Sequence, residues 1–151
     1  MKKIKNLPID IHEFYGVIVG FSAIKIDQSA TDQLKFYLSI ITPNFKASKS
    51  DLELIEENIL KTKNLIKNRK LNLKKMLDID SIEKLAFSFK NFINGLPLAL
   101  CLPFQNNIPE ELNSTINEIK LLNEFDLDLE DQNNFNYFDD ILEYLLNIIE
   151  Y

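Results

Sequence analysis

The sequence predicts an all-α, single-domain bundle of about six helices, and three observations support this fold class. Apolar residues recur at the 3.6-residue spacing of amphipathic helices, and no sustained alternation typical of strands appears. The 151 residues suffice for one domain with one core, and no Gly/Ser-rich or Pro-rich linker divides them. Two of the three glycines, Gly16 and Gly20, stand four apart in the most apolar segment, residues 14–24, which indicates a buried helix.

The first predicted helix covers residues 9–23, and its two glycines are expected to let a neighbouring helix approach closely. A second helix is predicted over residues 30–41, ending before a Thr-Pro pair because proline restricts the residue that precedes it. A third starts at Ser50, where Ser50 and Glu53 fit a capping box, and it ends near Asn68. Its expected apolar stripe comprises Leu52, Ile55, Ile59, Leu65 and Ile66.

The fourth predicted helix follows a segment of loose pattern, residues 69–80. The Asp-Ser pair at 80–81 caps this helix, and Gly95 is expected to end it in a left-handed conformation, with Pro97 preventing continuation. Residues 96–104 are then expected to form a buried, irregular connection. The inward-facing residues are Leu85, Phe89, Phe92 and Ile93.

Two further helices are predicted in the C-terminal part of the chain. The fifth begins with Pro109 at its first position and runs to about Asn123, and an acidic loop over residues 124–134 separates it from the last helix, residues 135–149. The residues expected to be buried are Leu112, Ile116, Ile119 and Leu122 in the fifth helix, and Phe138, Ile141, Leu142, Leu145 and Ile148 in the last.

Composition indicates a cytoplasmic protein. The single cysteine, Cys101, excludes an intrachain disulfide and a cysteine-clustered zinc site. Pro8 and the polar residues after it interrupt the start of the chain before a signal peptide can form, and the apolar run 14–24 is shorter than the roughly 20 residues of a membrane span. The abundance of Ile, Asn and Lys is typical of an AT-rich bacterial genome.

Charge is divided unevenly along the chain, whose net value is −6. Residues 1–103 hold 16 Lys/Arg and 11 Asp/Glu, a balance of +5, whereas residues 104–151 hold one Lys and 12 Asp/Glu, a balance of −11. An acidic C-terminal part argues against nucleic acid or an anionic membrane as its partner and suits a basic partner or a second copy of the chain. A solvated acidic face is the simpler interpretation.

The acidic loop is the nearest approach to a metal site. Asp126, Asp128, Glu130 and Asp131 alternate as in the start of an EF-hand, but position six of such a loop would be Asp131 instead of glycine, and position twelve would be Tyr137 instead of Glu. These four residues are therefore a candidate interaction surface, and no metal or cofactor is expected. A metal-dependent hydrolase that uses this loop is the alternative.

Three other features are weighed against plain structural roles. His12 is the only histidine and has no nucleophile nearby in sequence, so a capping or partly buried role is favoured. Cys101 lies in apolar sequence that would raise its thiol pKa, which favours an inert side chain. The stretch from Lys61 to Lys75 holds seven basic residues but no aromatic residue and one Arg, so a solvated helix end is favoured over nucleic-acid binding.

Three blocks in the order found here resemble the YgfB/YecA family of small bacterial proteins. These blocks are residues 16–20 with spaced glycines, residues 91–96 (Asn-Phe-Ile-Asn-Gly-Leu), and residues 117–144, where a helix, an acidic run and an Ile-x-Glu-Tyr helix follow one another. The chain departs from the family pattern in four places. His12-Glu13 is one residue out of register with a His-Gly pair, Ser88 replaces a tryptophan, Pro97 replaces a glycine, and Leu145 or Leu146 replaces an arginine.

The resemblance implies an all-helical domain over residues 1–151, a homodimer, and a family of poorly defined molecular function without catalytic residues to transfer. Some members carry a cysteine-rich zinc-binding tail, which these residues do not include. Together with the residues themselves, it leads us to expect a non-enzymatic module that binds an unidentified protein partner. Close packing at Gly16, Gly20 and Gly95 is expected to be structural.

Overall fold

The computed structural model describes residues 9–23, 32, 46, 48–78, 82–101, 104, 107–122 and 133–149. Six α-helices and no strand are found among these residues, so the predicted all-α fold class is confirmed. The helices are α1 (Ile11–Ala23), α3 (Lys49–Lys67), α4 (Leu73–Met76), α5 (Ile82–Cys101), α6 (Glu110–Leu122) and α7 (Asn133–Ile149). Apart from Asp32, the helix predicted over residues 30–41 lies outside the described residues, as do residues 124–132 of the acidic loop.

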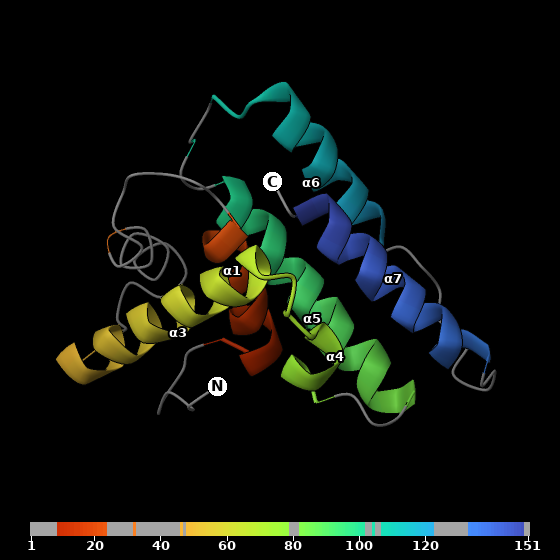
Figure 1. The fold of residues 1–151 in the computed structure, drawn as a ribbon, viewed down its shortest axis with the longest axis horizontal. Helices are drawn as coiled ribbons and strands as arrows, with labels where there is room; N and C mark the ends of the chain where they lie inside the picture. Colours follow the sequence, from red (N-terminus) through yellow and green to blue (C-terminus); the bar gives the residue numbers. More distant parts are fainter. Residues whose placement is uncertain are drawn as a thin grey trace.

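Helix α5 is the central element of the fold (Figure 1). On one side it packs against α1, which in turn packs against α3, and on the other side it packs against α6, which contacts α7. The short α4 contacts α7. Buried apolar side chains form two clusters, one between α1 and α3 that also includes Ala99, and a larger one that joins α1, α4, α5, α6 and α7.

Helix α1 begins at Ile11, two residues later than predicted, because Asp10 caps it. The Asp10 carboxylate accepts hydrogen bonds from the backbone N–H of His12 at 2.8 Å and of Glu13 at 3.4 Å. Most of the helix is buried, and the Ser22 hydroxyl donates to the carbonyls of Ile18 within α1 and Ile59 in α3. The first helix therefore lies in the interior, between α3 and α5.

The α1 and α5 backbones approach each other at three glycines. A methyl group at Gly16 would collide with the carbonyl oxygen of Phe92, and one at Gly95 would collide with the carbonyl oxygen of Glu13. At Gly20 a methyl carbon would lie 2.6 Å from Ala99 Cβ. Each helix thus offers a bare stretch of backbone to the other, so the two are held closer than side chains would allow.

The prediction that Gly95 ends the fourth helix is wrong. Helix α5 continues through Gly95 and Pro97 to Cys101, so the irregular connection predicted from residue 96 does not begin there. Gly95 has a negative φ, because its function is to accept the α1 backbone instead of making a turn. An internal proline destabilises a helix, but Leu96, Ala99 and Leu100 are buried in this part of α5. Their burial stabilises the continued helix.

The predicted start of the third helix is also wrong, by two residues. Ser48, not Ser50, is the N-cap of α3, and Asp51 returns the capping-box bond to the Ser48 backbone. The predicted end is confirmed, since Asn68 is the C-cap. Ile55 and Ile59 are buried as expected, with Asn58 and Thr62 beside them, whereas Leu52, Leu65 and Ile66 are half-buried.

A short helix that the sequence did not reveal occupies part of the segment 69–80. Asn72 caps α4 by accepting a hydrogen bond from Lys75 N–H, and Leu73 and Leu77 are buried. Arg69 and Asp78, on either side of it, adopt positive φ angles of 53° and 52°. Four helical residues are too few to produce a periodic pattern, so α4 is visible only through its contacts.

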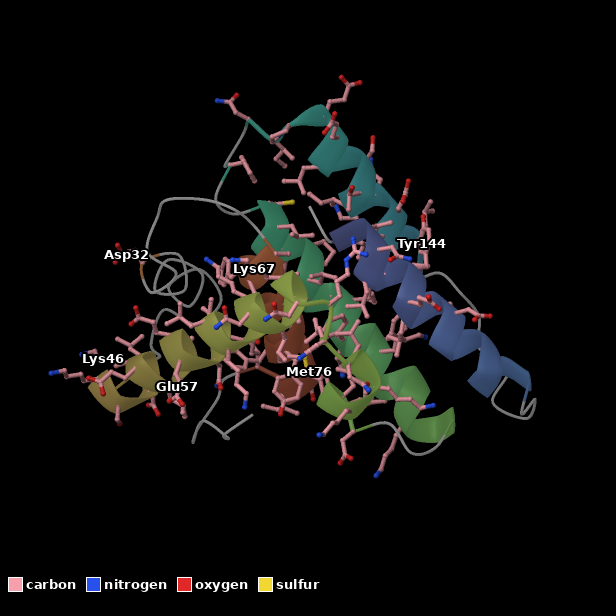
Figure 2. All side chains as sticks on the ribbon, viewed as in Figure 1. Asp32, Lys46, Glu57, Lys67, Met76 and Tyr144 are labelled. Atoms are coloured by element: carbon pink, nitrogen blue, oxygen red, sulfur yellow. The ribbon has the colours of Figure 1, made fainter. Side chains whose placement is uncertain are left out.

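The two predicted C-terminal helices are present, but Ile141 and Ile148 are half-buried instead of buried, and the side chain of Phe138 lies outside the described residues. Helix α6 begins directly after Pro109 and buries Leu112, Ile116 and Ile119, while Leu122 is half-buried. Helix α7 begins two residues earlier than predicted and buries Leu142 and Leu145. Tyr144, which lies between these two helices in Figure 2, donates a hydrogen bond of 2.7 Å to the Glu118 carboxylate.

Candidate functional site

Among the residues that the structure describes, the outward face of α5 carries an extended candidate site. Side chains on this face recur at intervals of three or four residues, so they form one line along the helix. We call this line the α5 stripe; it consists of Lys84, Phe87, Lys90, Asn94, Leu98 and Cys101, of which Cys101 is half-buried and the others are exposed. Phe87 and Leu98 stand out, since they leave 63% and 48% of their surface exposed.

A hollow of about 420 Å³ lies beside the first half of the α5 stripe. We call it the His12 hollow, because the only histidine of the chain lines it from α1. Its other lining residues are Leu77 and Asp78 from the end of α4 and Lys84, Phe87 and Ser88 from α5. The fold therefore places polar groups from three helices around one apolar floor, an arrangement typical of binding sites.

The polar groups near the His12 hollow are held by the first turn of α1. His12 Nδ1 lies 3.3 Å from an Asp10 carboxylate oxygen, and the imidazole ring meets Tyr15 and Phe87 edge-on. Burial, together with the nearby Asp10, raises the pKa of Glu13. Burial and the charge of Asp78 raise the pKa of Tyr15. Of the two roles predicted for His12, capping or partial burial, partial burial agrees with these contacts, because the cap of α1 is Asp10.

A second hollow, of about 390 Å³, lies beside the other half of the α5 stripe. We call it the Cys101 hollow; it is lined by Ile93, Asn94, Pro97, Leu98 and Cys101 from α5 and by Lys120 from α6. Pro97 has no N–H, so the carbonyl of Ile93 lacks the donor that an ordinary residue 97 would supply.

Cys101 is poorly suited to act as a nucleophile. Burial raises the pKa of its thiol, and the positive charge of Lys120 opposes that rise without cancelling it. The residues that line the hollow with it include no histidine or carboxylate to take the thiol proton. This direction of the pKa agrees with the inert cysteine expected from its apolar sequence neighbours.

The metal-binding alternative falls on a part of the chain for which the structure gives no geometry. Asp126, Asp128, Glu130 and Asp131 lie outside the described residues, so their use as an interaction surface or cation site stays a prediction. In the rest of the chain, the described histidine, cysteine and carboxylate side chains form no group of three or more that could hold a metal ion.

The basic stretch does not form a single helix face. Lys61 and Lys63 are two residues apart on α3, so their side chains point to different sides of the helix, and Lys67 follows at its end (Figure 2). Arg69 and Lys70 lie in the turn, and Lys74 and Lys75 belong to α4. Lys63 and Lys74 are half-buried and the other five are exposed.

Sequence reasoning missed the two residues that define the site best. The sequence pattern predicts no role for Phe87 and places Leu98 in a buried connection, and the prediction for Leu98 is wrong, since 48% of its surface is exposed. The available signal was their position: both fall outside the arc that contains Phe89, Phe92 and Leu96 when α5 is continued as one helix. Ending the helix at Gly95 concealed this signal for Leu98.

No helix among the described residues has the length and apolar character needed to cross a membrane. No protein-family model matches the chain, and no curated protein or solved structure that was searched matches it either. The interpretation of the two hollows therefore depends on their geometry and chemistry alone.

Proposed function

We propose that this chain is a non-enzymatic helical module that works by binding another protein through the α5 stripe. The observation that carries the proposal is the exposure of Phe87 and Leu98 on one line of the central helix, each beside a hollow. Apolar side chains next to recesses are typical of protein interfaces, where a few such residues supply most of the binding free energy.

Other exposed apolar residues do not form a comparable surface. Leu60 on α3 and Leu121 on α6 are 58% and 63% exposed, but neither lines one of the two hollows described on α5. Tyr144 is 45% exposed, and its hydroxyl is already hydrogen-bonded to Glu118. Scattered apolar residues of this kind are common on protein surfaces, so the α5 stripe is the stronger candidate.

The chemistry of the two hollows favours binding over catalysis. Burial keeps the Cys101 thiol protonated to a higher pH than a free thiol, which lowers its nucleophilicity. The His12 imidazole lies 3.3 Å from the carboxylate of Asp10, two residues before it, and Asp10 is the residue that caps α1. The Cys101 thiol and the His12–Asp10 pair are therefore better suited to contact a bound partner than to carry out a reaction.

The same proposal includes the setting of the protein. We place the chain in the YgfB/YecA family on the three sequence blocks that resemble it, and in the bacterial cytoplasm on its composition. We also propose a homodimer, in which the acidic C-terminal part of one copy faces the basic middle of the other. Light scattering at tens of micromolar tests this point, and a monomer mass would contradict it.

The test of protein binding uses two matched surface variants. Leu98→Glu introduces a charge into the α5 stripe, whereas Leu60→Glu introduces the same charge at a similarly exposed leucine on α3. Affinity purification from a lysate of the source cells, with quantitative mass spectrometry, is expected to recover a set of proteins with the native chain and with Leu60→Glu. The same proteins should be lost with Leu98→Glu. Equal recovery by both variants would contradict binding through this face.

A further inference from the structure

We infer that the element that binds the α5 stripe is an acidic amphipathic helix of the partner protein, an inference that rests on the proposed function. The stripe follows one helix, is apolar at Phe87 and Leu98, and carries Lys84 and Lys90, with Lys120 of α6 beside its second half. Each of these properties restricts the chemistry of the occupant, and together they identify a helix instead of a loop or a strand.

The spacing of the two apolar residues fits a helical occupant. Phe87 and Leu98 are eleven residues apart, which is about 16 Å along a helix axis and about three turns. A second helix lying along α5 would present apolar side chains at the same eleven-residue spacing on one of its own faces. Helices that bind grooves use anchor residues at such intervals.

The two hollows lie where such anchors would enter. The His12 hollow is bounded by α1 and the end of α4 and includes Phe87, whereas the Cys101 hollow is bounded by α6 and includes Leu98. They are therefore at opposite ends and on opposite edges of the α5 stripe. A helix crossing the stripe at a small angle would reach both, which agrees with the preferred crossing angles of packed helices.

The charges along this face favour a negatively charged occupant. Lys84, Lys90 and Lys120 lie at the beginning, the middle and the far edge of the stripe. The sequence of α5 contains Lys84, Lys90 and one carboxylate, Glu83, and none of the stripe residues is an Asp or Glu. Three carboxylates lie on the α1 and α4 side: Asp78 lines the His12 hollow, Asp10 lies against His12, and Glu13 packs against Gly95.

Other anionic ligands fit this surface less well. Nucleic acids are usually bound through arginines and exposed aromatic stacks, and the only Arg of the chain, Arg69, lies in the turn after α3. An anionic membrane requires a larger basic apolar face than two apolar side chains provide. An acidic helix uses the apolar spacing, the hollows and the lysines together.

The test uses defined peptides with the full-length chain. The first probe is a fluorescent helical peptide with two leucines eleven residues apart on one face and glutamates beside them. The second carries lysines in place of the glutamates, and the third keeps the glutamates but moves one leucine to the opposite face. Fluorescence anisotropy is expected to show that the first binds at least about tenfold more tightly than either of the others.

Two protein variants place the binding on the α5 stripe. Leu98→Glu should weaken the first peptide by about 30-fold, as expected for loss of an anchor, while Leu60→Glu should leave its affinity unchanged. Lys90→Glu should weaken it by about tenfold and reduce its dependence on salt. Circular dichroism of each variant verifies that the helical fold is retained.

The outcomes separate this inference from the proposed function. If proteins recovered from the lysate are lost with Leu98→Glu but no acidic peptide binds, the acidic-helix inference is wrong while protein binding stands. Equal affinity for the acidic and lysine peptides would also overturn it, as would tighter binding to a DNA duplex or to phosphatidylglycerol vesicles than to the first peptide. If Leu98→Glu changes neither experiment, both proposals fail.

Discussion

The inner and outer faces of α5 differ in the size and the exposure of the residues that they present. Toward α1 the helix presents Gly95, and the carbonyl of Glu13 occupies the space that a side chain would fill. Toward solvent it presents Phe87 and Leu98, which leave 63% and 48% of their surface exposed. The inner face is therefore constrained by backbone atoms of α1, whereas the outer face leaves two apolar side chains exposed.

The largest expected effect on stability comes from adding a methyl group where the α1 and α5 backbones meet. Gly16→Ala or Gly95→Ala places a methyl group against a carbonyl oxygen of the neighbouring helix, and backbone atoms cannot move aside as a flexible side chain can. We expect each variant to lose about 3 kcal/mol of unfolding free energy, a loss reduced by the better helix propensity of alanine. Urea denaturation followed by circular dichroism measures this loss.

The matched control is an alanine substitution on the outer face of the same helix. Lys90→Ala changes an exposed position five residues from Gly95 and should alter stability by less than about 0.5 kcal/mol. Should Gly95→Ala prove as stable as Lys90→Ala, the close approach of the two backbones would be wrong.

Gly20 provides an intermediate test, because its nearest neighbour is a side chain. A methyl carbon there would lie 2.6 Å from Ala99 Cβ and 3.0 Å from the Leu96 carbonyl oxygen. Gly20→Ala is therefore expected to cost about 2 kcal/mol, and Ala99→Gly in that background should recover about 1 kcal/mol as a coupling energy. A complete double-mutant cycle in urea measures this term, and strict additivity would show that the two positions do not touch.

On the outer face, stability should be insensitive to substitution. Phe87→Glu and Leu98→Glu are each expected to shift the unfolding free energy by less than about 0.5 kcal/mol, since both side chains are largely exposed. The same variants are expected to lose the partner. A loss of stability of the size predicted for Gly95→Ala would instead show that Phe87 or Leu98 belongs to the core.

The smallest effect concerns the thiol at the end of the α5 stripe. Because burial raises the pKa of Cys101, its alkylation by iodoacetamide should accelerate only at a higher pH than in the urea-unfolded chain. Lys120→Gln removes the charge that opposes this rise, so the midpoint of the rate profile should move higher still. Identical profiles for the folded and unfolded chains would place Cys101 in open solvent.

The sequence predicts the elements with a strong periodic pattern and fails where a contact overrides local chemistry. Ile116 and Ile119 in α6 and Leu142 in α7 are buried as expected. Amphipathic spacing predicts the buried face of a helix whichever element packs against it. Local rules for a terminal glycine followed by a proline predict a helix end at Gly95 and Pro97. The helix continues instead, because Gly95 packs against the α1 backbone and Leu96 is buried. Neither contact can be inferred from the sequence around Gly95 and Pro97.

The candidate site was less predictable than the fold. His12 and Cys101 attracted attention by residue type, and both line hollows, but the sequence offers no means of placing either beside α5 residues far along the chain. Phe87 and Leu98 are apolar residues in an apolar helix, so only the orientation of that helix distinguishes them from core residues. Orientation is set by the glycine contacts with α1, which are long-range.

The reciprocal glycine contacts also determine how α1 and α5 can move. Sliding or rolling one helix over the other would drive Cβ atoms into backbone oxygens, so the pair has a single register and shifts as one body. Helix α5 spans 20 residues, about 30 Å. A displacement imposed at the capped start of α1 would consequently move α5 with it.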